Sequence, residues 1–181
     1  FNQENWETER ITLAESDNTS RFEVVDIGGK KYEINSDDDY LDYIKNGFEP
    51  DMVYLFKLLA DGSKVILDVG ANIGCTALLF SSLSSMTYAF EPSPTTFNFL
   101  AGNILKSGLN NVIPLNLGLG DEPGESTLTF SPSNRSGGFV SNITQASSGH
   151  TVEKVAIRQL DEVVQSLRLQ SVDFIKIDVE G

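Results

Sequence analysis

The stretch Lys64–Gly74, KVILDVGANIG, constrains the fold of this chain more than any other part of it. Its apolar residues Val65–Leu67 run without alternation, which is typical of a strand buried on both faces of a parallel sheet. A glycine-rich turn and the helical pattern CTALLFSSL follow. Glycine lets the backbone approach a ligand closely, and ligands of open α/β sheets bind outside the carboxyl ends of the strands. The stretch therefore predicts a strand, turn and helix that form the floor of a binding site.

The pattern of strand and helix continues along the chain. MTYAFEP predicts a second strand that ends at Glu91, a helix opened by Pro92 and Pro94 runs to about Lys106, and NVIPLNLGL predicts a third strand. Such alternation implies right-handed crossovers and a parallel α/β sheet. VDFIKIDVEG predicts a buried fourth strand beside the first, which gives the order 3-2-1-4. An antiparallel hairpin of STLTF and TVEKVAI is inserted between strands three and four, with SPSNRSGGFVSN as a polar loop.

Two further segments have the periodicity of amphipathic helices. PDMVYLFKLLA places Val53, Phe56, Leu58 and Leu59 near one stripe, and we expect this helix to pack on the sheet. RQLDEVVQSLRL predicts a helix between the inserted hairpin and the fourth strand.

The N-terminal part divides into an arm, a hairpin and a short helix. Residues 1–20 are weakly patterned, and Trp6 within them is expected to fill a surface groove rather than bind a ligand. RFEVVDI and KKYEI flank Gly28-Gly29, which indicates a hairpin. The acidic run Asp37–Asp39 either caps the helix YLDYIKN or lies in a solvated loop, and cation binding is a third reading. We predict an extension over residues 1–49 and a cofactor-binding domain over residues 50–181.

Composition narrows the function. The net charge of −13 and the pI near 4.3, without any Lys/Arg cluster, argue against nucleic acid and anionic membranes as partners. One cysteine, Cys75, excludes an internal disulfide and a cysteine-rich metal site, so the default compartment is the cytoplasm. The chain begins at Phe1 and stops after an apolar strand, and we expect it to be a piece of a longer protein.

The glycine turn and Glu91 together indicate a nucleoside. Dinucleotide-binding turns read G-x-G-x-x-G, but here Asn72 stands where the middle glycine would admit a pyrophosphate. A carboxylate at the end of the second strand can accept hydrogen bonds from both hydroxyls of an adenosine ribose. Glu91 is suited to that role in NAD and S-adenosylmethionine sites alike. Its alternative is an exposed carboxylate at a strand end.

DVGANIG, FEPSP and IKIDVEG, in this order, resemble the FkbM-type methyltransferases. GFEP and NLGLGDEPG are also similar to that family, so the resemblance covers about Gly47 to Gly181. It implies a Rossmann-like class I fold, S-adenosyl-L-methionine as the cofactor, and a small-molecule or sugar acceptor methylated on oxygen.

The resemblance also implies roles for single residues. The methionine portion of the cofactor would be lined by Asp68, Gly70, Asn72 and Gly74. Glu91 would hold the ribose, and Asn116 and Gly118 would border the adenine. Asp178 and Glu180 would face the transferred methyl group and the acceptor. Asp68 has a second, compatible reading, in which it ties the turn by accepting backbone N–H bonds.

Other reactive side chains are weaker candidates. Asp178 and Glu180 without a nearby histidine make a poor metal site, so no metal is assigned, although a shared metal stays an alternative. His150 lies in a polar loop, where an exposed residue is expected rather than a catalytic base. Cys75 opens a helix, which can lower a thiol pKa, but a small buried residue is the simpler reading.

Class I domains carry about three further strands after the fourth. Their absence would leave the fourth strand at an edge, which further chain, a second copy or another molecule must cover. Two other functions stay open: an NAD-dependent oxidoreductase, against which Asn72 argues, and a non-catalytic nucleoside-binding module.

Overall fold

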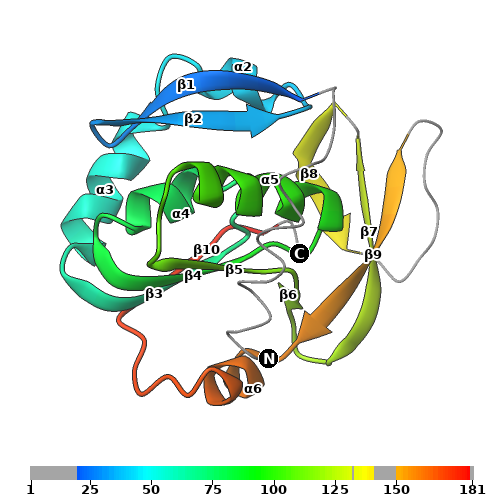
Figure 1. The fold of residues 1–181 in the computed structure, drawn as a ribbon. Coiled ribbons are helices and arrows are strands. Elements are labelled where there is room, and N and C mark those ends of the chain that lie inside the picture. The colour runs from blue at the N-terminus through cyan, green and yellow to red at the C-terminus, as the bar shows by residue number, and fades with distance from the viewer. Residues whose placement is uncertain (1–19, 132, 141–149, 180–181) are drawn as a thin grey trace.

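The computed structural model describes residues 20–131, 133–140 and 150–179. A central parallel sheet lies between helices, a hairpin covers the helices on one side, and a second, largely antiparallel sheet stands beside the central one (Figure 1). The predicted N-terminal arm, with Trp6, lies outside the described residues.

The central sheet has the predicted order. Its strands are β3 (Ser63–Val69), β4 (Ser84–Phe90), β5 (Val112–Leu115) and β10 (Phe174–Ile177). They pair in parallel as β10-β3-β4-β5, which confirms the α/β class and the order 3-2-1-4. The carboxyl ends of all four strands therefore meet at one edge, and the turn after β3 lies at the middle of that edge.

Helices cover both faces of this sheet (Figure 1). On one face lie α4 (Cys75–Phe80) and α5 (Pro94–Lys106), and on the other lies α6 (Leu160–Ser166). Every residue of α4 is buried. A helix that is apolar all round needs cover on both sides, and the hairpin of the N-terminal extension supplies the second side.

The extension consists of β1 (Arg21–Ile27), β2 (Lys30–Ser36) and α2 (Tyr40–Ile44). Antiparallel pairing of β1 with β2 around Gly28–Gly29 confirms the hairpin. The N-cap residue of α2 is Asp39, whose side chain makes no capping bond, but the carboxylate of Asp38 accepts hydrogen bonds from the Tyr40 N–H at 3.2 Å and from the Ser36 hydroxyl. Val25 of this extension and Phe56 of the following helix share one buried cluster. The division at residue 49 stays a prediction.

Helix α3 (Pro50–Ala60) corrects one expectation about packing. Val53, Phe56 and Ala60 face the core, but Leu58 and Leu59 are 68% and 59% exposed. The inward residues follow the i, i+3, i+7 spacing of a helix, position 58 falls on the opposite side, and position 59 falls on the flank of the inward stripe. The prediction that these two leucines pack inward was wrong.

The second sheet contains β6 (Gly118–Leu119), β7 (Gly124–Ser131), β8 (Asn134–Val140) and β9 (Thr151–Arg158), in the order β6-β9-β7-β8. Antiparallel pairing of β7 with β9 confirms the inserted hairpin.

Two expectations about this part of the chain were wrong. The predicted third strand breaks after Leu115, and its remainder, β6, joins this sheet beside β9. The expected polar loop contains β8, because backbone hydrogen bonds to β7 do not require apolar side chains.

Strand β10 forms an edge of the central sheet among the described residues. The prediction of a buried strand was therefore wrong for most of it: Ile175 and Ile177 are 40% and 68% exposed, and Lys176 is the buried residue of the strand. Apolar residues exposed on an edge strand are the kind of surface that a neighbouring segment or molecule covers.

Candidate functional site

The turn after β3 bends sharply where it meets the end of β10. Gly70 has φ +75°, and a Cβ there would lie 2.0 Å from the Asp178 carbonyl oxygen, so only glycine fits. The N–H groups of Gly70 and Ala71 both donate to the Phe90 carbonyl, at 3.0 and 2.9 Å. Asn72 also has a positive φ, of 50°. Backbone from three neighbouring strands thus fixes the shape of the turn.

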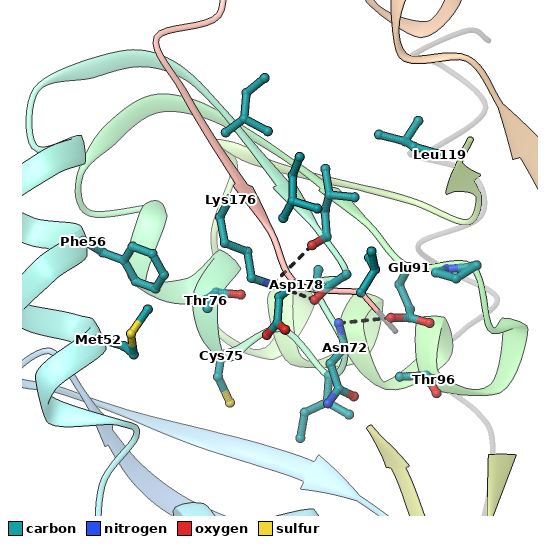
Figure 2. A pocket seen from close by; sticks show the side chains of 18 of the residues that line it. Met52, Phe56, Asn72, Cys75, Thr76, Glu91, Thr96, Leu119, Lys176 and Asp178 are labelled. Carbon is teal, nitrogen blue, oxygen red and sulfur yellow. Dashed lines mark hydrogen bonds between the residues drawn. The ribbon is translucent and has the colours of Figure 1, made fainter. Parts of the chain in front are cut away.

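Glu91 directly follows β4 and reaches the turn (Figure 2). One carboxylate oxygen accepts the Asn72 N–H at 3.1 Å, and the other accepts the Ser93 N–H at 2.9 Å. Burial raises the pKa of Glu91 to about 7, against the opposing effect of the two N–H donors and of Lys176. A further hydrogen-bond donor that enters the site would stabilise the charged form of this carboxyl group.

An ion pair that the sequence did not indicate lies beneath the turn. The Lys176 ammonium is 3.0 Å from an oxygen of Asp68, and both side chains are buried. The other Asp68 oxygen accepts the Thr76 hydroxyl at 2.6 Å, and Lys176 also donates to the Gly70 carbonyl at 2.7 Å. The single lysine within the apolar run FIKI was the available signal, because a charge on a buried strand needs a partner.

A cleft of about 1170 Å³ opens over this turn. Glu91, Thr96 and Leu119 lie at one end of it, and Met52 and Phe56 lie at the other (Figure 2). The turn and the end of β10 form the floor between the two ends. A cleft at the carboxyl ends of parallel strands is the usual location for a ligand in this class of fold.

Four of the predicted site residues line the cleft: Gly70, Asn72, Glu91 and Asp178. Other predicted residues lie outside its lining, namely Asp68, Gly74, Asn116 and Gly118. Asp68 lies under the turn in the ion pair, and its carboxylate contacts the Lys176 ammonium and the Thr76 hydroxyl rather than backbone N–H groups. Glu180 lies outside the described residues.

The Asn116 side chain supports the end of β4. Its amide donates to the carbonyl oxygens of Glu91 and Pro92, at 2.9 and 3.0 Å. The residues that face the cleft from this segment are Leu119 and Gly120, a short distance further along the chain. The break between β5 and β6, which the sequence did not indicate, accounts for that shift.

Further residues of the cleft come from the N-terminal extension, and no site role was predicted for them from the sequence. Tyr40 of α2 and Glu49, just before α3, both line it. Burial is the main cause of a strongly raised Tyr40 pKa, and negative charges including Glu49 and Asp178 add to it. These groups therefore lie within electrostatic reach of one another.

Neither Cys75 nor His150 is placed as a reactive group, since Cys75 lines the cleft but is buried, and His150 lies outside the lining. Burial raises the pKa of the Cys75 thiol to about 12, with Asp68 and Glu49 adding to the shift, so the thiol stays protonated at neutral pH. His150 is exposed and does not line the cleft. Across residues 20–131, 133–140 and 150–179, no three His, Cys, Asp or Glu side chains gather in a way that could hold a metal ion. No helix in the same part of the chain is long and apolar enough to cross a membrane.

Comparison with known proteins identifies the family. The family model of the methyltransferase FkbM domain matches residues 68–181. The chain belongs to the FkbM methyltransferase family. It is also 33% identical, over 133 residues, to the hexuronic acid methyltransferase AglP of Haloferax volcanii, with 74% of this chain and 52% of AglP covered. The chain thus spans about half the length of this curated relative.

Among solved structures, the chain is similar to TYW2 of M. jannaschii in complex with AdoMet. The TM-score is 0.39 at 23% identity, with 56% of this chain and 44% of that chain covered. Trm5b of Pyrococcus abyssi gives a TM-score of 0.38 at 23% identity, with 56% and 29% covered.

Proposed function

We propose that this chain binds S-adenosyl-L-methionine and belongs to an enzyme that methylates an oxygen of a sugar or another small hydroxylated molecule. The observation that carries the proposal is Glu91, a desolvated carboxylate that lines a cleft beside a glycine turn. Family membership supports the transfer of a methyl group. The name of the relative AglP, a hexuronic acid methyltransferase, supports a sugar acceptor.

The residues of the cleft fit the nucleoside part of the cofactor. Glu91 has two carboxylate oxygens, each with one backbone donor, and a carboxylate can accept about two bonds per oxygen. Two adjacent ribose hydroxyls would therefore find acceptors there. Gly70 leaves the floor of the cleft bare of side chain, and Leu119 offers an apolar surface for a base. The roles predicted for Asn116 and Gly118 beside the adenine stay predictions.

The floor of the site would hold the other parts of the ligand. Gly70 and Asn72 would line the methionine portion, and Asp68 and Gly74 would act indirectly by shaping the turn. The cofactor, when bound, supplies a methyl group on a sulfonium whose sulfur is a good leaving group. The protein then has to align the acceptor and exclude water, which the apolar walls around Met52 and Phe56 favour.

Asp178 is the carboxylate proposed to receive the proton of the acceptor hydroxyl. It follows β10, its backbone N–H donates to the Val69 carbonyl at 3.1 Å, and its exposed side chain lies on the cleft. A general base placed within reach of the acceptor oxygen raises the rate by about 10²–10⁴-fold. Glu180 is the second carboxylate proposed for this role.

Calorimetry with S-adenosylhomocysteine tests the proposal. We expect the full chain to bind it and Glu91→Ala to weaken binding by about 10-fold or more, because a charged hydrogen-bond acceptor is lost. Glu125→Gln, at an exposed position on β7, is the matched control and should bind as the wild type does. Absence of binding, or NADH binding in its place, would reject the assignment. Methyl transfer measured with labelled cofactor separates an enzyme from a non-catalytic nucleoside-binding module.

A further inference from the structure

We propose that the N-terminal extension forms the acceptor-binding end of the cleft, and that this end is built for an uncharged, polyhydroxylated ring such as a neutral hexopyranoside. The inference rests on the proposed function and adds to it a location and a charge for the acceptor. It concerns Tyr40 and Glu49, which lie before the segment matched by the FkbM family model.

The cleft has room for two ligands placed end to end. Glu91 and Leu119 occupy one end, and Met52 and Phe56 occupy the other, with Asp178 between them (Figure 2). If the nucleoside lies against Glu91, the acceptor must approach from the side of Met52 and Phe56. That side is formed by α3 and by the segment that leads into it, so the extension supplies the wall that the acceptor meets.

The wall has the chemical character of a sugar site. Tyr40 brings a phenol, Glu49 brings a carboxylate, and Asp178 adds a second carboxylate from the floor. Sugar hydroxyls donate well to carboxylates, and a phenol can both donate and accept. Met52 and Leu59, which also line the cleft, are 37% and 59% exposed and add apolar surface against which the C–H face of a pyranose ring can pack.

The charges of the wall argue against an anionic acceptor. Among the described residues that line the cleft, Lys176 is the cation, and its ammonium already contacts Asp68 and the Gly70 carbonyl. Among the side chains that the structure describes in this lining, an incoming carboxylate would face Glu49 and Asp178 with no free cation to offset the repulsion. Recognition of anions in proteins relies on Arg, Lys or exposed backbone N–H groups, so this wall favours a ring without charge.

The experiment compares a matched pair of probes on the full chain saturated with S-adenosylhomocysteine. The probes are methyl β-glucopyranoside and methyl β-glucopyranosiduronate, and their dissociation constants are measured by saturation-transfer NMR. We expect the neutral glycoside to bind at least about tenfold more tightly, which corresponds to about 1.4 kcal/mol. Tyr40→Phe and Glu49→Gln should each weaken that binding about fivefold or more. Glu49→Gln should also narrow the discrimination against the uronate, because it removes one negative charge.

Tyr43→Phe on the same helix and Glu125→Gln on β7 are the controls, since Tyr43 is 76% exposed and both residues lie away from the cleft. The inference fails if the uronate binds as tightly as the glucoside, if neither probe binds the loaded protein, or if Tyr40→Phe behaves like Tyr43→Phe. Calorimetry on the same samples measures S-adenosylhomocysteine binding separately. If the wild type does not bind S-adenosylhomocysteine, the proposed function itself is overturned. If it binds S-adenosylhomocysteine but does not prefer the glucoside to the uronate, only the acceptor assignment is overturned.

Discussion

The two ends of the cleft differ in how the chain builds them. The nucleoside end comes from the turn 70–74 and from Glu91, which follow adjacent parallel strands and lie close together in the sequence. The other end combines Tyr40 and Glu49 of the N-terminal extension, and it adjoins Asp178 of the floor, which comes from a distant part of the chain. The first end is thus fixed by local backbone geometry, and the second depends on how the extension packs. A substitution or a change of pH can disturb one of these two ends or the contacts that join them, and we expect the following effects.

The largest effect is expected from Gly70→Ala. The added Cβ would lie 2.0 Å from the Asp178 carbonyl, at a φ of +75° that a side chain rarely adopts. The turn and the end of β10 would have to separate, and we expect a loss of about 5 kcal/mol in the free energy of unfolding. S-adenosylhomocysteine binding should be lost as well. Denaturant unfolding and calorimetry measure the two effects.

Gly102→Ala is the control for that substitution. A Cβ at Gly102 meets nothing within 4 Å, and the residue lies inside α5 with helical φ. The change should therefore be neutral or stabilising, by up to about 1 kcal/mol. Equal behaviour of the two alanine variants would show that the turn tolerates a side chain, and the account of the nucleoside end would lose its basis.

Lys176→Met disturbs the floor that both ends share. It leaves the buried Asp68 carboxylate with only the Thr76 hydroxyl as a partner, and an uncompensated buried charge costs about 4 kcal/mol. The double variant Asp68→Asn/Lys176→Met should recover more than half of this loss, because no buried charge remains. Unfolding in denaturant measures both variants. Additive losses in the double variant would mean that the two residues do not interact.

Glu91 should give the chain a pH-dependent stability. Its folded-state pKa of about 7 lies above the ordinary 4.5, so the folded protein holds this proton where the unfolded chain has released it. The contribution of Glu91 to stability is therefore fully present at low pH, falls by about 3 kcal/mol as the pH rises from about 5 to 7, and then levels off. Glu91→Gln should remove this part of the slope. Parallel stability curves for the wild type and the variant would contradict the account.

A smaller effect is expected from Asn103→Ala, which cuts the contact between the extension and the turn. The Asn103 amide accepts the Asn35 N–H at 2.8 Å and donates to the carbonyls of Asn35 and Ile73, at 3.1 and 2.9 Å. Loss of these buried bonds should cost about 2 kcal/mol. Gln165→Ala, at an exposed position on α6, should change the free energy of unfolding by less than about 0.5 kcal/mol. Equal losses would mean that Asn103 does not hold the extension in place.

The sequence predicted the parts that depend on short-range order. The strand before Gly70, the turn and the helix after it are encoded in adjacent residues, and the alternation of strands and helices sets the sheet order. Glu91 could be assigned to the cleft because it ends the strand next to that turn. The hairpin around Gly28–Gly29 was predictable for the same reason.

Features that depend on tertiary contact were not predictable from these patterns. The pairing of Lys176 with Asp68 joins distant positions, and β8 is held by backbone pairing with β7 rather than by its composition. Leu59 fits a hydrophobic stripe by composition, but it lies on the flank of α3 that lines the cleft and is exposed there. Tyr40 reaches the cleft only because the hairpin and α2 fold over α4.

A crystal structure of the full chain with S-adenosylhomocysteine tests the central claim most directly. We predict that both ribose hydroxyls lie within hydrogen-bond distance of the Glu91 carboxylate oxygens, with the base against Leu119 and the sulfur pointing toward Asp178. A ligand bound outside the cleft, or a ribose turned away from Glu91, would contradict it.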